Sequence, residues 1–200
     1  MIKNIIFDCS DTLLSFDSPA WLATLTGDAE RADRIHSTIF KSPVWYRYDN
    51  GDATLEDVER EALPLLEEGD RDIARRYLQE WIYHYTPIEG MPQLLSDLKA
   101  AGYRLYLLSD FPDCFPKLAA RFDFFGLFDG LMVSYRVHCA KRDNGALFDC
   151  LLREYALNAE ECAFVDDLPP YVELAKARGI RAHIAADAKS IRDWLKGLNE

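Results

Sequence analysis

Ile2-Lys-Asn-Ile-Ile-Phe-Asp8 is a short apolar run that ends at an acidic residue. It is rich in β-branched side chains and lacks polar alternation, which is typical of a strand buried on both faces. Similar apolar runs recur at residues 103–108, 131–133, 162–165 and 180–184. The sequence therefore predicts five short buried strands.

Helical patterns separate the later strands. Residues 91–98 carry apolar side chains at the spacing of one helix face, and Gly102 is a typical residue just past a helix end. Comparable patterns lie at residues 147–155, 169–179 and 191–198. Strands that alternate with helices in this way predict an α/β fold, in which a doubly wound parallel sheet is covered by helices on both faces.

Residues 16–86 break this alternation, because they show helical spacings and no strand pattern. Thr54 followed by Asp57 resembles a capping box at a helix start, and Asp70 is placed to cap a later helix. The sequence thus predicts a core of residues 1–15 and 87–200 and a helical insert at residues 16–86.

Composition narrows the class of protein. Of the 200 residues, 49% are hydrophobic, which is too many for a disordered chain. The 23 Lys and Arg against 34 Asp and Glu give a net charge of −11, which argues against a nucleic-acid partner. No apolar run approaches the roughly 20 residues of a membrane span, and the start does not resemble a secretory signal. Five Cys without a C-x-x-C pair fit free thiols in a reducing compartment. We therefore expect a cytoplasmic protein without a membrane partner; nothing in the sequence indicates its oligomeric state.

Polar residues stand where the predicted strands end. They are Asp8, Ser109, Asp110, Asp166 and Asp167, with Lys141 after the third strand. Ligands of parallel α/β sheets bind at the carboxyl ends of the strands, so these side chains should converge. Neighbouring carboxylates repel one another unless a cation lies among them, and oxygen ligands suit Mg²⁺. With the ammonium and the hydroxyl they would form a receptor for a phosphoryl dianion, and one carboxylate could act as a nucleophile.

The same residues carry a resemblance to a known family. Residues 8–12, Ser109, Lys141 and residues 166–167 match, in order and spacing, the four motifs of the haloacid dehalogenase-like (HAD) hydrolase superfamily. Residues 164–180 resemble its fourth motif with the following helix. The chain is similar over nearly its whole length to the phosphatase branch of the subfamily IA type, which carries a helical C1 cap after the first strand.

The resemblance implies a Mg²⁺-dependent hydrolase of a small phosphorylated metabolite, such as a sugar phosphate. Asp8 would attack phosphorus to give an aspartyl phosphate, which water then hydrolyses. The implied magnesium ligands are Asp8, the backbone carbonyl of Ser10, Asp166 and Asp167. The implied substrate-binding residues are Ser109, Asp110 and Lys141, of which Ser109 and Lys141 also assist catalysis.

Ser10 departs from the family pattern. The phosphatases have a second Asp at this position, which protonates the leaving group and later activates water. Such general acid–base catalysis contributes about 10²–10⁴-fold in rate, and a serine hydroxyl cannot supply it. The neighbouring Asp11 is not assigned this role. The alternative is therefore a degenerate member that binds Mg²⁺ and a phosphorylated ligand with little or no turnover.

Two other classes fit less well. Receiver domains of signalling systems also hold acidic residues and a Lys around Mg²⁺, but in the reverse order and in a shorter chain. Haloacid dehalogenases lack an acidic pair like that of Asp166 and Asp167. The aromatic stretch of residues 45–48 fits either a substrate pocket or packing between insert and core.

Overall fold

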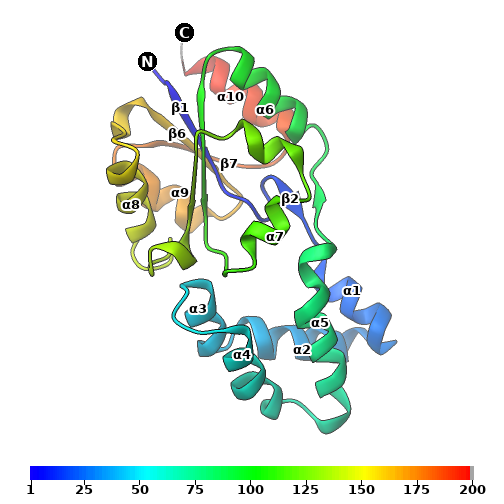
Figure 1. Cartoon of the computed structure of the whole chain (residues 1–200). Coiled ribbons are helices and arrows are strands. Elements are labelled where there is room, and N and C mark those ends of the chain that lie inside the picture. Colours follow the sequence, from blue (N-terminus) through cyan, green and yellow to red (C-terminus); the bar gives the residue numbers. More distant parts are fainter. Residues whose placement is uncertain (199–200) are drawn as a thin grey trace.

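The computed structural model, which describes residues 1–198, contains a five-stranded parallel sheet (Figure 1). Its strands are β1 (Asn4–Phe7), β4 (Arg104–Ser109), β5 (Gly130–Val133), β6 (Cys162–Asp166) and β7 (Arg181–Ile184). They lie in the order β5-β4-β1-β6-β7, so β1 is central. The predicted doubly wound α/β fold is confirmed.

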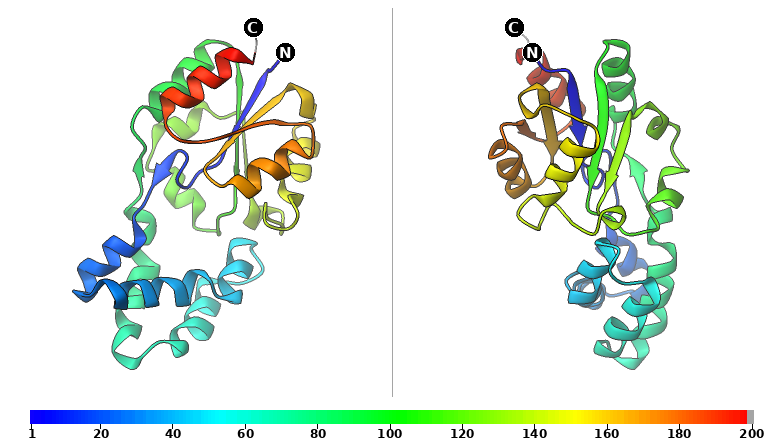
Figure 2. Two further views of the ribbon diagram at one scale, coloured as in Figure 1. Left: turned by 180° about the vertical axis from the view of Figure 1, so that it is seen from behind. Right: turned by 60° about the vertical axis from the view of Figure 1, so that its left-hand side comes forward.

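Helices cover both faces of the sheet (Figure 2). Side chains of a strand point alternately to opposite faces. Ile5 and Phe7 of β1 accordingly pack in one apolar cluster with residues of α6 (Met91–Ala100) and α10 (Ala188–Gly197). Ile6 packs in a second cluster with residues of α8 (Ala146–Glu154) and α9 (Pro169–Lys176). Because both faces of β1 are covered, its sequence is an unbroken apolar run.

Five α-helices within residues 16–86 lie beyond the carboxyl ends of the strands of the sheet (Figure 1). They are α1 (Ser18–Thr26), α2 (Ala29–Phe40), α3 (Pro43–Asp49), α4 (Leu55–Ala62) and α5 (Arg71–Glu80), and we call residues 16–86 the helical insert. The capping box of Thr54 and Asp57 forms at the start of α4, as predicted. The predicted cap by Asp70 is wrong, because its carboxylate accepts a hydrogen bond from Arg31 of α2 instead.

A two-residue antiparallel ladder joins the entry and exit of the insert. It pairs β2 (Leu14–Ser15) with β3 (Thr86–Pro87). The prediction of no strand within residues 16–86 is therefore wrong at Thr86, because two residues are too few to show strand alternation. The ladder holds both connections to the insert side by side, close to the end of β1.

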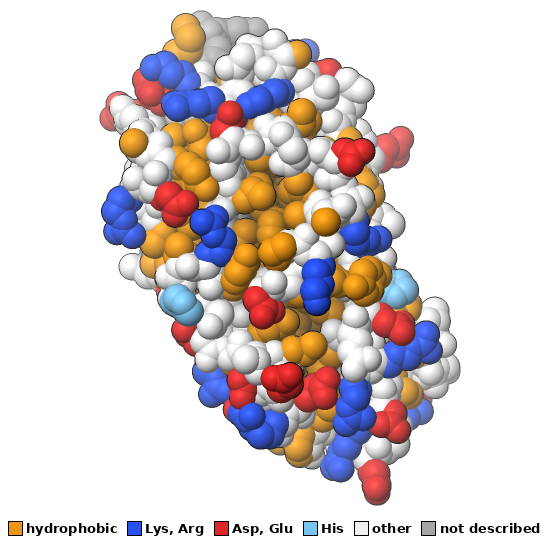
Figure 3. Space-filling view, viewed as in Figure 1, with side chains coloured by type: hydrophobic (Ala, Val, Ile, Leu, Met, Phe, Trp, Pro, Cys, Tyr) orange, Lys and Arg blue, Asp and Glu red, His pale blue; other side chains and the backbone are white. Residues whose placement is uncertain are grey.

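The remaining helix, α7 (Phe115–Ala119), lies on the side of the molecule seen in Figure 1. On this face charged side chains of both signs surround a central group of hydrophobic side chains (Figure 3). Phe115, Leu131 and Val133 line an apolar groove between α7 and β5. None of the helices within residues 1–198 has both the length and the apolar character of a membrane span.

Candidate active site

Three adjacent strands bring the acidic and hydroxyl side chains together. Asp8 directly follows β1, Ser109 is the last residue of β4, and Asp166 is the last residue of β6. Because β4 and β6 flank β1 in parallel, their carboxyl ends lie at the same edge of the sheet. All three side chains are buried. The predicted convergence at this edge is therefore a consequence of the strand order.

Lys141 joins two of the carboxylates. Its Nζ donates hydrogen bonds to Asp8 Oδ1 and Asp166 Oδ2, both at 2.6 Å, and its side chain is only 2% exposed. Burial lowers the pKa of Lys141, but Asp8 and Asp166 more than offset this effect, so the net pKa is raised. The backbone N–H of Lys141 donates to Asp110 Oδ1 at 2.7 Å. Asp110 therefore positions the loop that carries the ammonium.

Asp8, Asp166 and Asp167 form an acidic group with the character of a magnesium site. Each offers a carboxylate oxygen within 4.8 Å of the other two, and no other group of three potential ligands within residues 1–198 meets this geometry. Burial raises the pKa of Asp8 to about 8, and burial together with Asp166 raises the pKa of Asp167 to about 6. The three carboxylates lie close together with a single ammonium between two of them, and the donor set is all oxygen, so a hard divalent cation fits these residues.

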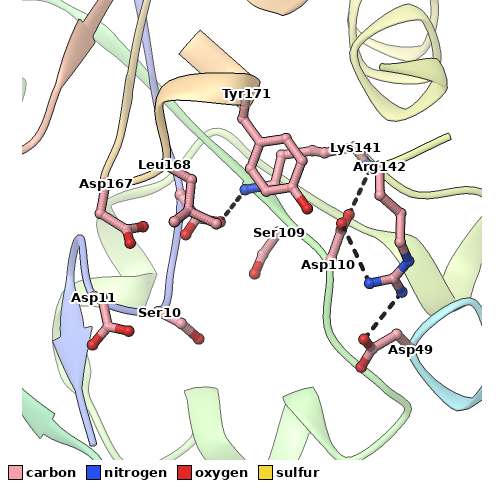
Figure 4. A pocket seen from close by; sticks show the side chains of 11 residues that line it. Ser10, Asp11, Asp49, Ser109, Asp110, Lys141, Arg142, Asp167, Leu168 and Tyr171 are labelled. Carbon is pink, nitrogen blue, oxygen red and sulfur yellow. Dashed lines mark hydrogen bonds and ion pairs between the residues drawn. The ribbon is translucent and has the colours of Figure 1, made fainter. Parts of the chain in front are cut away.

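Ser10 is engaged with the helical insert. Its hydroxyl lies 3.1 Å from the hydroxyl of Tyr85, a buried residue just before β3. The next residue, Asp11, has a φ of 55°, an uncommon left-handed conformation that turns the chain toward β2. Asp11 lies at the edge of the site beside Ser10 and away from Lys141 (Figure 4). Ser10 thus links the end of β1 to the insert.

The insert contributes a carboxylate of its own. Asp49, the last residue of α3, is buried and accepts a hydrogen bond from Arg142 at 3.0 Å. Arg142 also lies 3.9 Å from Asp110 Oδ2, so its guanidinium stands between the two carboxylates (Figure 4). Burial raises the pKa of Asp49 to about 7, although Arg142 lowers it. Ser134, at the end of β5, donates to the backbone carbonyl of Asp49 and fixes the end of α3 against the core.

These side chains surround one cavity of about 250 Å³ at the carboxyl edge of the sheet. A family model of haloacid dehalogenase-like hydrolases matches residues 2–179, which is most of the chain. The chain belongs to this family.

This HAD-like hydrolase is similar to one curated protein in sequence and to several solved structures in fold. The chain is 26% identical over 186 residues to drimenol cyclase drtB of Aspergillus calidoustus; the match covers 91% of the chain but only 34% of that protein. The chain thus spans about a third of the length of this curated relative.

Three solved structures share the fold. A HAD-like family hydrolase from Porphyromonas gingivalis has a TM-score of 0.75 at 18% identity, covering 100% of this chain and 99% of that one. A HAD family enzyme of Bacteroides thetaiotaomicron, in complex with magnesium and inorganic phosphate, has a TM-score of 0.71 at 18% identity. The match covers 94% of this chain and 96% of that one. The L-2-haloacid dehalogenase of Xanthobacter autotrophicus has a TM-score of 0.68 at 19% identity, and the match covers 91% of this chain and 76% of that one.

The HAD-like motifs account for one side of the cavity. Its lining includes six residues singled out in the sequence: Asp8, Ser10, Ser109, Asp110, Lys141 and Asp167. Asp166 is fully buried and reaches the site through Lys141. The sequence did not predict the residues on the other side of the cavity. Asp49, Arg142 and Tyr171 line the cavity but were not among the site residues predicted from the sequence. Tyr171 lies with its ring centroid 4.6 Å from the ammonium of Lys141.

Proposed function

We propose that this HAD-like hydrolase hydrolyses a small phosphomonoester in a Mg²⁺-dependent reaction. The observation that carries the proposal is the placement of Lys141 between Asp8 and Asp166, with Asp167 and Ser109 at the same edge of the sheet. Phosphoryl transfer depends mainly on positioning and charge neutralisation. An ammonium, a hydroxyl and three carboxylates that can hold a cation supply both.

In the proposed reaction Asp8 attacks phosphorus, the alcohol leaves, and water then hydrolyses the aspartyl phosphate. Lys141 and the Ser109 hydroxyl orient the phosphoryl oxygens. The carboxylates of Asp8, Asp166 and Asp167, with the backbone carbonyl of Ser10, would hold Mg²⁺. A bound Mg²⁺ supplies charge neutralisation for the phosphoryl group. The structure of the Bacteroides thetaiotaomicron relative in complex with magnesium and inorganic phosphate supports the choice of Mg²⁺ and a phosphate group.

The leaving alcohol needs a proton that Ser10 cannot supply, and we assign this step to Asp49. Its carboxyl lines the catalytic cavity from the insert side, and its pKa of about 7 is suited to proton exchange at neutral pH. Protonated Asp49 would give its proton to the departing oxygen. The resulting carboxylate would take a proton from the water that attacks the intermediate, which restores the starting state.

The helical insert, residues 16–86, is proposed to act as a cap over the site. Within this segment, Asp49 contacts Arg142 of the core, and Tyr85 contacts Ser10 of the core. A cap in this position excludes bulk water from the reacting phosphate and surrounds the leaving group. Closure would thereby complete the set of side chains around the substrate.

The alternative function is recognition of a phosphorylated ligand without turnover, which the loss of the acidic residue at position 10 favours. An assay of phosphate release distinguishes the phosphatase from the binder. Its substrates are p-nitrophenyl phosphate and a panel of sugar phosphates and nucleotides, each tested with Mg²⁺ and with EDTA. We expect Mg²⁺-dependent release that disappears in Asp8→Asn, while circular dichroism shows an intact fold. Release that persists in Asp8→Asn would remove the nucleophile assignment. No release from a protein that still binds Mg²⁺ would favour the binder.

A further inference from the structure

A second cavity opens from the catalytic cavity toward the helical insert. Its volume is about 140 Å³, and it shares Ser10, Asp49 and Asp110 with the catalytic cavity. The rest of its lining is apolar or aromatic: Phe40, Trp45, Trp81, Tyr85, Phe111 and Pro112. We call this space the aromatic cavity.

The aromatic side chains hold one another in place. The ring centroid of Trp81 lies 5.1 Å from that of Phe111, 5.5 Å from that of Trp45 and 5.9 Å from that of Tyr85. All four side chains are buried. Aromatic pairs at such distances prefer particular mutual orientations. The walls are therefore already arranged before a ligand enters, which reduces the ordering that binding would require.

Few hydrogen-bonding groups of the aromatic cavity are free. The hydroxyl of Tyr85 is paired with Ser10. At the junction of the two cavities, Asp49 Oδ2 and Asp110 Oδ1 already accept hydrogen bonds from the core. Among the described residues that line the aromatic cavity, Asp110 Oδ2 is the one buried polar side-chain atom without a hydrogen-bond partner. Each hydroxyl of a sugar ring would lose its water there, and most would find no replacement partner. An apolar group of the same size loses no hydrogen bond.

The reaction geometry directs the leaving group into this space. In phosphoryl transfer the attacking and leaving oxygens lie roughly in line across phosphorus. Asp8 attacks from the end of β1, which belongs to the sheet. The leaving oxygen therefore points away from the sheet and toward the helical insert, past Ser10 and Asp49, where the aromatic cavity begins.

We propose that the substrate is a phosphate monoester of a compact apolar alcohol or phenol, whose organic part occupies the aromatic cavity. This inference rests on the proposed function and replaces the sugar phosphate suggested by the family resemblance. The size of the cavity limits the group, because an apolar cavity of about 150 Å³ in another protein holds one benzene molecule. One six-membered ring or a short branched alkyl chain therefore fills it.

The test compares benzyl phosphate with glucose 6-phosphate in the presence of Mg²⁺. Both are esters of primary alcohols with a six-membered ring, so they differ mainly in the polarity of the group that enters the cavity. We expect kcat/KM to be at least tenfold higher for benzyl phosphate. Equal values, or a preference for glucose 6-phosphate, would overturn the inference while leaving the proposed phosphatase intact.

Binding of benzylphosphonate and methylphosphonate, measured calorimetrically with Mg²⁺, gives a readout that does not need turnover. We expect the benzyl compound to bind at least tenfold more tightly. That preference in a protein without phosphatase activity would sustain the inference while the proposed function fails. Equal affinities would overturn the inference.

A variant that enlarges the cavity ties the preference to this site. Trp45→Leu should shift the affinity ratio of 2-naphthylmethylphosphonate to benzylphosphonate at least tenfold toward the larger ligand. The matched control is Trp194→Leu, because Trp194 stacks on His183 of β7, and neither residue lines either cavity. Thermal unfolding checks that both variants fold. An unchanged ratio in folded Trp45→Leu, or the same shift in Trp194→Leu, would overturn the assignment of the cavity.

Discussion

Replacing Lys141 with Met should destabilise the fold strongly, and by an amount that depends on pH. The substitution keeps an unbranched side chain and removes the ammonium between Asp8 and Asp166. In the absence of metal, burial raises the pKa of Asp8 to about 8, so this carboxyl is mostly protonated at pH 7. The group left without a charged partner is then the carboxylate of Asp166, whose side chain is 0% exposed and whose Oδ1 still accepts a hydrogen bond from the backbone N–H of Leu168.

The magnitude follows from the two states open to Asp166. A buried charge that loses its partner costs about 3–5 kcal/mol. Protonation instead costs about 4 kcal/mol at pH 7, because the ordinary pKa of Asp is about 3.9 and each pKa unit is about 1.36 kcal/mol. At pH 5 the same protonation costs about 1.5 kcal/mol. We therefore expect a loss of about 3–4 kcal/mol at pH 7 and about 1–2 kcal/mol at pH 5.

The expected pH dependence of this loss agrees in sign with proton linkage. A low pH favours neutralisation of the buried carboxylate that has lost its ammonium, so the stability of the variant falls as pH rises. Urea unfolding in EDTA, followed by tryptophan fluorescence at both pH values, measures the loss. The control is Lys176→Met, because Lys176 forms a surface ion pair with Glu173 and such pairs contribute about 0–1 kcal/mol. A loss below about 1 kcal/mol at pH 7, or one that does not shrink at pH 5, would refute the reasoning.

Three further predictions concern the metal and the proton donor. Mg²⁺ at 100 times its Kd should stabilise the protein by about 2.7 kcal/mol, which raises Tm by about 5–11 °C in scanning fluorimetry. Asp166→Asn should reduce this rise in Tm below about 2 °C, and an equal rise in the variant would remove Asp166 from the metal site. The affinity for Mg²⁺, measured calorimetrically, should fall roughly 100-fold from pH 8 to pH 6, because binding must displace the protons held by Asp8, with its pKa of about 8, and by Asp167, with its pKa of about 6; a constant affinity would contradict this. Asp49→Asn should lower kcat/KM for benzyl phosphate by about 10²-fold or more but leave kcat/KM for 2,4-dinitrophenyl phosphate within about threefold, because kcat/KM reports transfer to Asp8 and only the poor leaving group needs a proton in that step. Equal losses on both esters would mean that Asp49 only links the insert to the core.

The core fold was predictable because its signals are local. Residues 2–7 form an apolar run that only a strand covered on both faces can bury, and the later strands repeat the pattern between helical stripes. Asp8, Ser109 and Asp166 converge because β4 and β6 flank β1 in parallel. Asp70 was misjudged because the choice between capping α5 and pairing with Arg31 depends on how α2 packs.

The side of the cavity that faces the helical insert was decided by tertiary structure alone. The contact of Asp49 with Arg142 joins residues 93 positions apart, and that of Ser10 with Tyr85 joins residues 75 apart. No periodicity within α3 distinguishes Asp49 from an ordinary helix end, and residues 45–48 were equally consistent with packing and with a pocket. The sequence by itself determined the strands and the polar residues at their ends, because those follow from local burial patterns. Only the packing of the insert against the sheet determined which side chains face the leaving group, because that depends on contacts between distant segments.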